Sequence, residues 1–260
     1  MAKNNWFAWV VAGLSATGPL PAENFADAVV DYDPGAGYAV NYTNVNAVLG
    51  EPSRANPFND PTEPFNPPYG TGQILSVGAG GSLTVRFSTP ILNHPNNSFG
   101  LDFIIFGNTG FIITNDFDPV TFEWIGTPAT DGSLFAQNTG STRVLVSRDG
   151  ETFFELDPAR APVVDHLFPT DGWADFSRPV DPILTQEDFA GLTLEQIRAL
   201  YNGSAGGAAF DISWARDSDG QPVFLPEIKL VRVEVLSGKS EIDGVVAASR
   251  RARGPNVTGR

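Results

Sequence analysis

The sequence predicts an all-β protein, a two-sheet sandwich of jelly-roll type with one inserted α-helix near residues 193–202. The 260-residue chain contains 27 glycines and 21 prolines, which indicates many turns, and 19 phenylalanines to fill a core. Several segments alternate apolar and polar residues with a period of two, as half-buried strands do. With about eight or more strands, two packed sheets cover the strand edges most simply.

Two segments predict individual strands of different kinds. Residues 82–88 (SLTVRFS) place Leu83, Val85 and Phe87 on one face, as a strand with one buried face requires. Residues 101–106 (LDFIIF) are almost wholly apolar, which predicts a central strand that is buried on both faces.

Two hairpins are predicted. Residues 142–147 and 152–156 flank a D-G dipeptide, which is typical of a hairpin turn. Residues 228–236 and 241–247 flank a Ser-Gly-Lys turn, and this pair has the clearest alternation in the sequence.

One segment has helical spacing. Leu194 and Ile197 lie on one face of the predicted helix, and Thr193 and Gln196 match a reciprocal capping box. Gly203 suits the position that follows a helix end.

The two ends of the chain are predicted to lie outside a single domain of residues 23–248. Residues 1–22 contain Lys3, a short apolar run and a Pro-rich stretch that ends at Ala22, which resembles a secretory signal peptide. A membrane-spanning helix needs about 20 apolar residues, more than this run supplies. A buried first strand or helix is the alternative. Residues 249–260 contain four arginines without periodicity, which predicts a disordered basic tail.

Charge and cysteine content exclude several classes of protein. Sixteen Lys and Arg residues against 30 Asp and Glu residues give a formal net charge of -14. This charge argues against binding to nucleic acid and to anionic membranes. The chain has no cysteine, so it has no disulfide, iron–sulfur cluster or thiolate-bound zinc. We therefore expect an exported bacterial protein, secreted or on the cell surface, that is not inserted in the membrane after signal cleavage.

Eight short motifs resemble, in order, those of a poorly characterised group of exported bacterial cell-surface proteins. That group often carries a C-terminal sorting helix, which the tail here lacks, so release from the cell and surface retention both stay open. The motifs span most of the chain. They are residues 32–35 (YDPG), 48–52 (VLGEP), 80–87 (GGSLTVRF), 100–108 (GLDFIIFGN), 146–153 (VSRDGETF), 208–212 (AAFDI), 231–233 (VRV) and 241–245 (EIDGV).

More distantly, the VSRDG hairpin and the EID strand resemble discoidin-like, galactose-binding-like sandwiches. This resemblance implies a jelly roll that often binds glycans and often holds a structural calcium, and it does not imply catalysis. In such families, calcium often joins loop carbonyls to an acidic residue of the last strand. Calcium prefers six to eight oxygen ligands, and aspartates are frequent in the turns of this chain. The candidate ligands are Asp102, Asn108, Asp211, Glu241 and Asp243. The alternative is that these side chains cap turns or accept buried backbone hydrogen bonds.

Exposed aromatic residues are the candidates for glycan binding, because aromatic rings stack on sugars while polar groups bind hydroxyls. Trp173 lies in a polar loop between Asp171 and Asp175, and Tyr69 lies in a proline-rich loop. These four residues form the predicted ligand site, whereas Trp214 is expected in the core.

No motif indicates an enzyme. The chain has two histidines, His94 and His166, and lacks a G-x-S-x-G motif, a P-loop and a dinucleotide fingerprint. We expect a non-catalytic protein that recognises an extracellular glycan or matrix polymer, with calcium in a structural role. One alternative is a structural protein of the matrix or envelope that self-associates through sandwich edges or through the proline-rich loop 51–72. The other is a polysaccharide hydrolase or lyase on the same fold. The sequence does not predict the oligomeric state.

Overall fold

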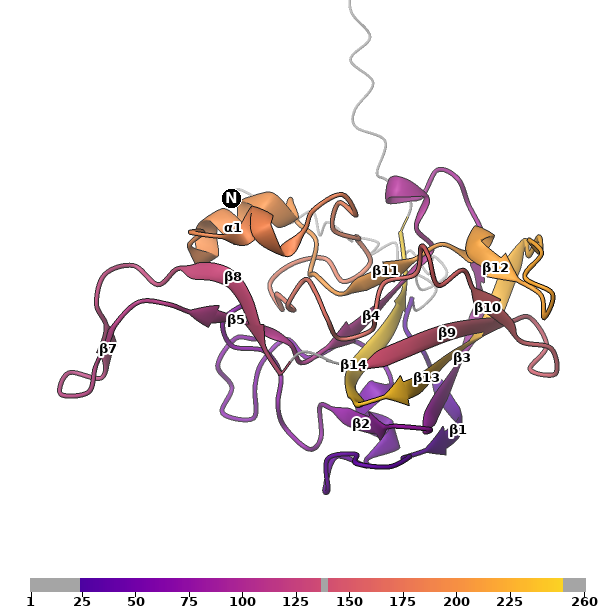
Figure 1. The fold of residues 1–260 in the computed structure, drawn as a ribbon, viewed down its shortest axis with the longest axis horizontal. Coiled ribbons are helices and arrows are strands. Elements are labelled where there is room, and N and C mark those ends of the chain that lie inside the picture. Colours follow the sequence, from indigo (N-terminus) through magenta and orange to yellow (C-terminus); the bar gives the residue numbers. More distant parts are fainter. Residues whose placement is uncertain (1–23, 137–139, 250–260) are drawn as a thin grey trace, which may run out of the picture.

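The computed structural model describes residues 24–136 and 140–249, and its main body is a sandwich of two antiparallel sheets (Figure 1). The larger sheet consists, in spatial order, of β1 (Ala28–Asp33), β3 (Ser82–Leu92), β13 (Glu227–Ser237), β9 (Ser141–Ser147), β10 (Phe154–Leu156) and β12 (Ala215–Arg216). The smaller sheet consists of β11 (Ala208–Phe210), β4 (Phe103–Gly107), β14 (Lys239–Ala247) and β2 (Leu75–Gly78). The all-β sandwich predicted from sequence is confirmed. The predicted signal peptide and almost all of the basic tail lie outside the described residues.

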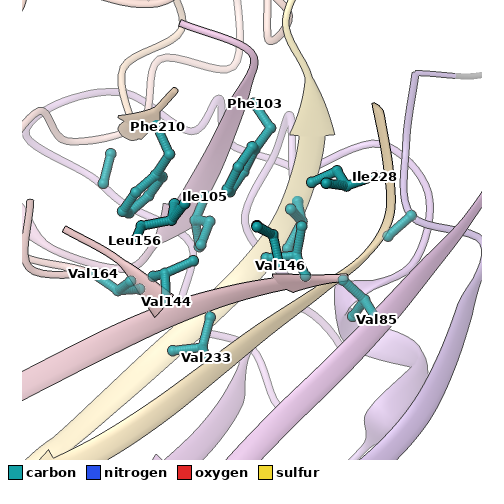
Figure 2. Packing of buried hydrophobic residues seen from close by; sticks show 14 of the residues in the cluster. Val85, Phe103, Ile105, Val144, Val146, Leu156, Val164, Phe210, Ile228 and Val233 are labelled. Atoms are coloured by element: carbon teal, nitrogen blue, oxygen red, sulfur yellow. The ribbon is translucent and has the colours of Figure 1, made fainter. Parts of the chain in front are cut away.

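The main core fills the space between the two sheets. Val85 and Val233 of the larger sheet belong to the same buried cluster as Phe103, Ile105 and Phe210 of the smaller sheet (Figure 2). The rings of Phe103 and Phe210 stack with their centroids 5.2 Å apart. Leu83, Val85 and Phe87 are buried together, as the alternation in residues 82–88 predicts, and Thr84 on the other face is buried as well and accepts a hydrogen bond from Arg232.

Strand β4 is buried on both faces, which confirms the prediction for residues 101–106. Ile104 and Phe106 point away from the main core and pack in a separate buried cluster with Phe176, Ala205 and Val246. Because both faces of β4 pack against apolar side chains, neither face carries polar residues, and the sequence of the strand does not alternate.

The first predicted hairpin is confirmed, and the second is wrong. Strands β9 and β10 pair antiparallel around the D-G turn. Strand β13, however, pairs with β3 on one edge and with β9 on the other. Strand β14 pairs with β4 and β2 in the opposite sheet. Because both edges of β13 are already occupied, the turn at Gly238 leads from one sheet to the other.

A second, smaller lobe lies beside the sandwich. It contains β5 (Gly110–Ile113) paired with β8 (Thr130–Phe135), and the helix α1 (Leu194–Tyr201). Its buried side chains are Phe111, Leu134, Val180, Phe189, Ile197 and Tyr201. The helix confirms the prediction, and Thr193 N–H donates to Gln196 Oε1 at 2.9 Å at its start. The described residues also form four short 3₁₀ turns: η1 (Val45–Val48), η2 (Ser98–Gly100), η3 (Gln186–Phe189) and η4 (Ile212–Trp214).

A two-stranded hairpin projects from this lobe (Figure 1). It consists of β6 (Phe117–Asp118) and β7 (Glu123–Trp124). Val120 is 84% exposed and Phe122 is 78% exposed, so its tip presents apolar side chains to solvent. None of the helices in the described ranges is long and apolar enough to cross a bilayer.

Candidate functional site

The exposed tryptophan of the predicted ligand site lies on a loop whose backbone is firmly held. Trp173 is 70% exposed. On one side of it, Gly172 N–H donates to Thr62 O at 2.9 Å. On the other side, Ala174 N–H donates to Asp171 O at 3.1 Å. The backbone of the loop is therefore held on both sides of Trp173, while the indole ring faces solvent.

Arg54 of the proline-rich loop lies at the base of this tryptophan loop. Its Nη1 donates to Gly172 O at 2.6 Å, and its guanidinium lies 4.8 Å from the centroid of the Phe176 ring. Glu51 binds the same guanidinium through both carboxylate oxygens, at 2.9 and 2.5 Å. This hydrogen bonding raises the pKa of Arg54 above its ordinary value. Loop 51–72, which is irregular as predicted, is thus tied to the tryptophan loop.

Gly172 is required at this junction. A Cβ atom there would lie 2.6 Å from Arg54 O, closer than side chains approach a backbone atom. The two loops can therefore touch only where one of them lacks a side chain. The DGWAD motif combines this close approach with the exposed ring of Trp173.

Asp171 positions the loop and does not face solvent. Its side chain is 3% exposed, and it binds Arg198 Nε at 2.7 Å and Nη2 at 3.1 Å. Arg198 also lies 3.5 Å from Glu63, so the helix, the proline-rich loop and the tryptophan loop meet at one cation. The hydrogen bond to Asp171 raises the pKa of Arg198. Because both Asp171 oxygens are engaged, we assign it a positioning role in place of the predicted contact with ligand.

Of the other two predicted ligand residues, Asp175 lies close to this site. Asp175 is exposed, accepts hydrogen bonds from Ser177 N–H at 2.9 Å and Oγ–H at 2.7 Å, and lies within electrostatic reach of Arg54. Tyr69 is instead tied to an earlier segment, because the Tyr42 hydroxyl donates to its carbonyl oxygen at 2.7 Å. We call Glu51, Arg54, Trp173 and Asp175 the Trp173 platform.

Two of the five predicted calcium ligands lie together. Asn108 Nδ2 donates to Glu241 Oε2 at 2.7 Å, and Lys239 Nζ donates to Glu241 Oε1 at 2.6 Å. Next to them lies Asp165, a residue that the sequence did not single out. Its Oδ1 accepts the N–H groups of Asn108 and Thr109, each at 3.0 Å, and its Oδ2 accepts the Glu241 N–H at 3.2 Å. Burial raises the pKa of Asp165 well above its ordinary value, despite these three hydrogen bonds.

Asp102 occupies a different place. Its Oδ1 accepts from His94 N–H at 3.0 Å and from Asn97 Nδ2 at 2.8 Å, and its Oδ2 accepts from Ile212 N–H at 2.9 Å. Burial raises its pKa to about 6, although the hydrogen bonds act in the opposite direction. Asp102 therefore joins the loop before β4 to the turn after β11, which is the role of a buried acceptor.

The last two candidates, Asp211 and Asp243, also accept hydrogen bonds from other groups of the protein. Asp211 accepts the Ser213 N–H at 2.7 Å and so caps the short turn η4. Asp243 is buried on β14, where it accepts both the N–H of Ser53 at 2.8 Å and its Oγ–H at 2.7 Å. Burial raises the pKa of Asp243 to about 7.

These donor sets do not fit a calcium site as they stand. Calcium needs six to eight oxygens, whereas every oxygen of Glu241 and Asp165 already accepts a hydrogen bond. Asn108 Oδ1 is buried without a hydrogen-bond partner among the described residues, and it is one oxygen where calcium needs several. In that same part, no group of three or more His, Cys, Asp or Glu side chains is placed to hold a metal ion. Calcium binding stays a prediction, and a calcium-selective rise in melting temperature after chelation is the result that would support it.

The comparisons with known proteins add no family assignment. No family model matches the chain, and no curated protein matches it significantly. The site must therefore be interpreted from its own geometry.

Proposed function

We propose that this is an exported, non-catalytic binding protein that recognises an extracellular glycan or matrix polymer at the Trp173 platform. The observation that carries the proposal is an indole that is 70% exposed on a loop fixed by Arg54 and by the Asp171–Arg198 ion pair. A single exposed apolar side chain is common on protein surfaces, and what distinguishes Trp173 is the set of charged groups held beside its loop, Glu51, Arg54 and Asp175.

The chemistry of the platform suits a sugar. An indole face packs against the C–H face of a pyranose ring, while the guanidinium of Arg54 and the carboxylates of Glu51 and Asp175 bind hydroxyl groups. Because the hydrogen bonds of the two loops already hold Arg54 in place, little conformational entropy is lost when a ligand binds.

Substitution of the exposed ring tests the proposal. The full chain should bind one or more polysaccharides in a glycan array screened with calcium and with a chelator. Trp173→Ala should weaken that binding at least about tenfold in calorimetry, because truncating an aromatic anchor removes a main binding contact. Trp124→Ala is the matched control, since Trp124 is also exposed but lies on the β6–β7 hairpin. Absence of any glycan ligand, or equal losses in both variants, would contradict the proposal.

A second candidate, self-association, is favoured by the β6–β7 hairpin. Phe117 packs edge-on against both Phe122 and Trp124, with centroid distances of 6.4 and 5.1 Å, so the tip is an ordered aromatic cluster. Asp118 and Glu123 are paired across the hairpin, and their like charges oppose contact between two copies.

Self-association through this hairpin should therefore strengthen with salt, which screens the carboxylates. In sedimentation velocity at rising protein concentration, Val120→Asp should remove the oligomer by placing a charge in the contact. Ile183→Asp is the control, because Ile183 is an equally exposed apolar residue elsewhere. A wild-type protein that stays monomeric at high concentration and high salt would rule this candidate out.

A further inference from the structure

We propose that a second site, a cavity between loop 160–168 and strand β11, binds a small monocarboxylate with an apolar body. The cavity has a volume of about 220 Å³. Its walls include Leu101, Val163, Phe168, Val180, Leu184 and Trp214. It shares no residue with the Trp173 platform, so this inference does not depend on the proposed function.

The size and lining of the cavity define the body of the ligand. A cavity of about 150 Å³ holds benzene, and drug-sized ligands need about 300 Å³ or more. The volume of this cavity lies between these values, which suits one ring with a short chain, or an acyl chain of medium length. Because its lining residues are almost all aliphatic or aromatic, the cavity favours a hydrocarbon over a sugar.

The charge at the cavity defines the head group. Arg160 and His166 are its two basic lining residues. The Arg160 guanidinium lies 5.0 Å from the centroid of the Trp214 ring. Among the described residues, no carboxylate forms an ion pair with Arg160, and neighbouring Asp157 instead binds Arg216 at 2.8 Å. A carboxylate on the ligand would form with this guanidinium the direct ion pair that no described carboxylate forms with it.

One of the lining residues, Trp214, also carries a buried donor. The indole Nε1 of Trp214 is buried, and it has no hydrogen-bond acceptor among the described residues. A buried donor without an acceptor is costly, and native proteins retain few of them. Since the Trp214 ring lines the cavity, its indole N–H signal is also a direct reporter of occupancy.

The wall of the cavity is held in its shape before any ligand binds. Asp165 and Phe168 adopt left-handed backbone angles, with φ of 59° and 55°. Asp165 is fixed by its three backbone donors, and Phe168 O accepts the Gly207 N–H at 2.8 Å. Backbone conformations of this kind concentrate at binding sites, because the surrounding contacts must hold them.

The test uses octanoate and 3-phenylpropanoate as probes, with octanamide as the uncharged analogue of the first. Binding to the full chain is measured by calorimetry, and the tryptophan indole signals are followed by ¹H–¹⁵N NMR. Three variants are compared with the wild type: Arg160→Gln removes the charge, Val163→Phe fills the cavity, and Arg148→Gln removes an exposed charge on the β9–β10 turn.

Both carboxylates should bind and shift the Trp214 indole signal. Octanoate should bind at least about tenfold more tightly than octanamide, as one charge-assisted contact implies. Arg160→Gln should abolish that preference, Val163→Phe should abolish binding, and Arg148→Gln should bind like the wild type. The proposal is overturned if neither carboxylate binds at millimolar concentration, if octanamide binds as well as octanoate, or if Arg160→Gln and Arg148→Gln behave alike. The variant Trp173→Ala, which should lose glycan binding, should bind octanoate as tightly as the wild type.

Discussion

Replacement of Asp165 by alanine is expected to lower the free energy of unfolding by about 3 kcal/mol or more, a large share of the ~5–15 kcal/mol typical of a folded protein. The carboxylate is the acceptor for the N–H groups of Asn108, Thr109 and Glu241. Each buried donor that loses its acceptor costs about 1–3 kcal/mol. The left-handed backbone at Asp165 adds to this cost, because alanine tolerates that conformation poorly.

Denaturant unfolding of three variants separates this role from a general effect of removing a charge. Asp165→Asn keeps one acceptor oxygen and suits the left-handed backbone, so it should lose clearly less stability than Asp165→Ala. Asp149→Ala is the control, because Asp149 also accepts two backbone N–H groups but lies in an exposed turn. It should lose much less stability. A loss below about 1 kcal/mol for Asp165→Ala would show that water or rearrangement replaces the carboxylate.

Gly107→Ala gives an independent check on the same contact. A Cβ atom at Gly107 would lie within 2.2 Å of Asp165 Oδ1, so the methyl group must displace the carboxylate from its donors. Asp165 connects the end of β4 to β14 and also fixes the loop that lines the apolar cavity. The residue that stabilises the sandwich therefore also shapes the cavity wall.

The sequence predicted those parts of the fold that depend on local pattern. Alternation identified β3, continuous apolarity identified β4, and the capping pair Thr193 and Gln196 identified α1. The pairing of β13 with β14 was predicted wrongly, because a hairpin and a crossing between sheets need the same alternation and the same short turn. What decides between them is which strands occupy the edges of β13, and those strands are distant in the sequence.

In the candidate sites, too, features that depend on neighbouring residues were predictable, and contacts between residues far apart in the sequence were not. The exposure of Trp173 was predictable from the polar, glycine-containing segment around it. The partners that fix it were not, because Arg54 lies 118 residues away from Gly172 in the chain. Asp165 gave no local signal, since its donors are 56 to 76 residues away. Asp102 and Asp243, two of the aspartates expected to bind calcium, accept hydrogen bonds from distant backbone N–H groups. Residue type and spacing alone do not distinguish such acceptors from metal ligands.

The stability of the protein is expected to fall as pH rises from about 4 to about 7. Burial raises the pKa of Asp243 to about 7, against about 3.9 for an aspartate in an unfolded chain. Between these values the folded protein holds a proton that the unfolded chain releases, so each increase in pH favours unfolding. The contribution is fully present below about pH 4 and is lost as pH passes through about 7. Asp102 acts in the same direction, through a pKa of about 6.

Asp243→Asn isolates this contribution. The amide is neutral at every pH, can accept the Ser53 N–H, and can donate to Ser53 Oγ, so both hydrogen bonds survive in the variant. The free energy of unfolding of the variant, relative to that of the wild type, should therefore increase by about 2–4 kcal/mol between pH 4.5 and pH 8, as a shift of about three pKa units implies. Urea unfolding across that range measures the difference. Asp217→Asn, in an exposed turn, should follow the wild type throughout.

Parallel curves for Asp243→Asn and the wild type would show that Asp243 titrates as it does in the unfolded chain, and hence that water reaches it in the folded protein. The aspartates whose pKa is lowered, such as Asp157, do not confuse this comparison. Their contribution is lost as pH falls through values below about 4, outside the range measured. Asp243 lies on β14, which pairs with β4, the strand that is buried on both faces. The protonation of Asp243 therefore links the pH of the solution to the stability of the whole sandwich.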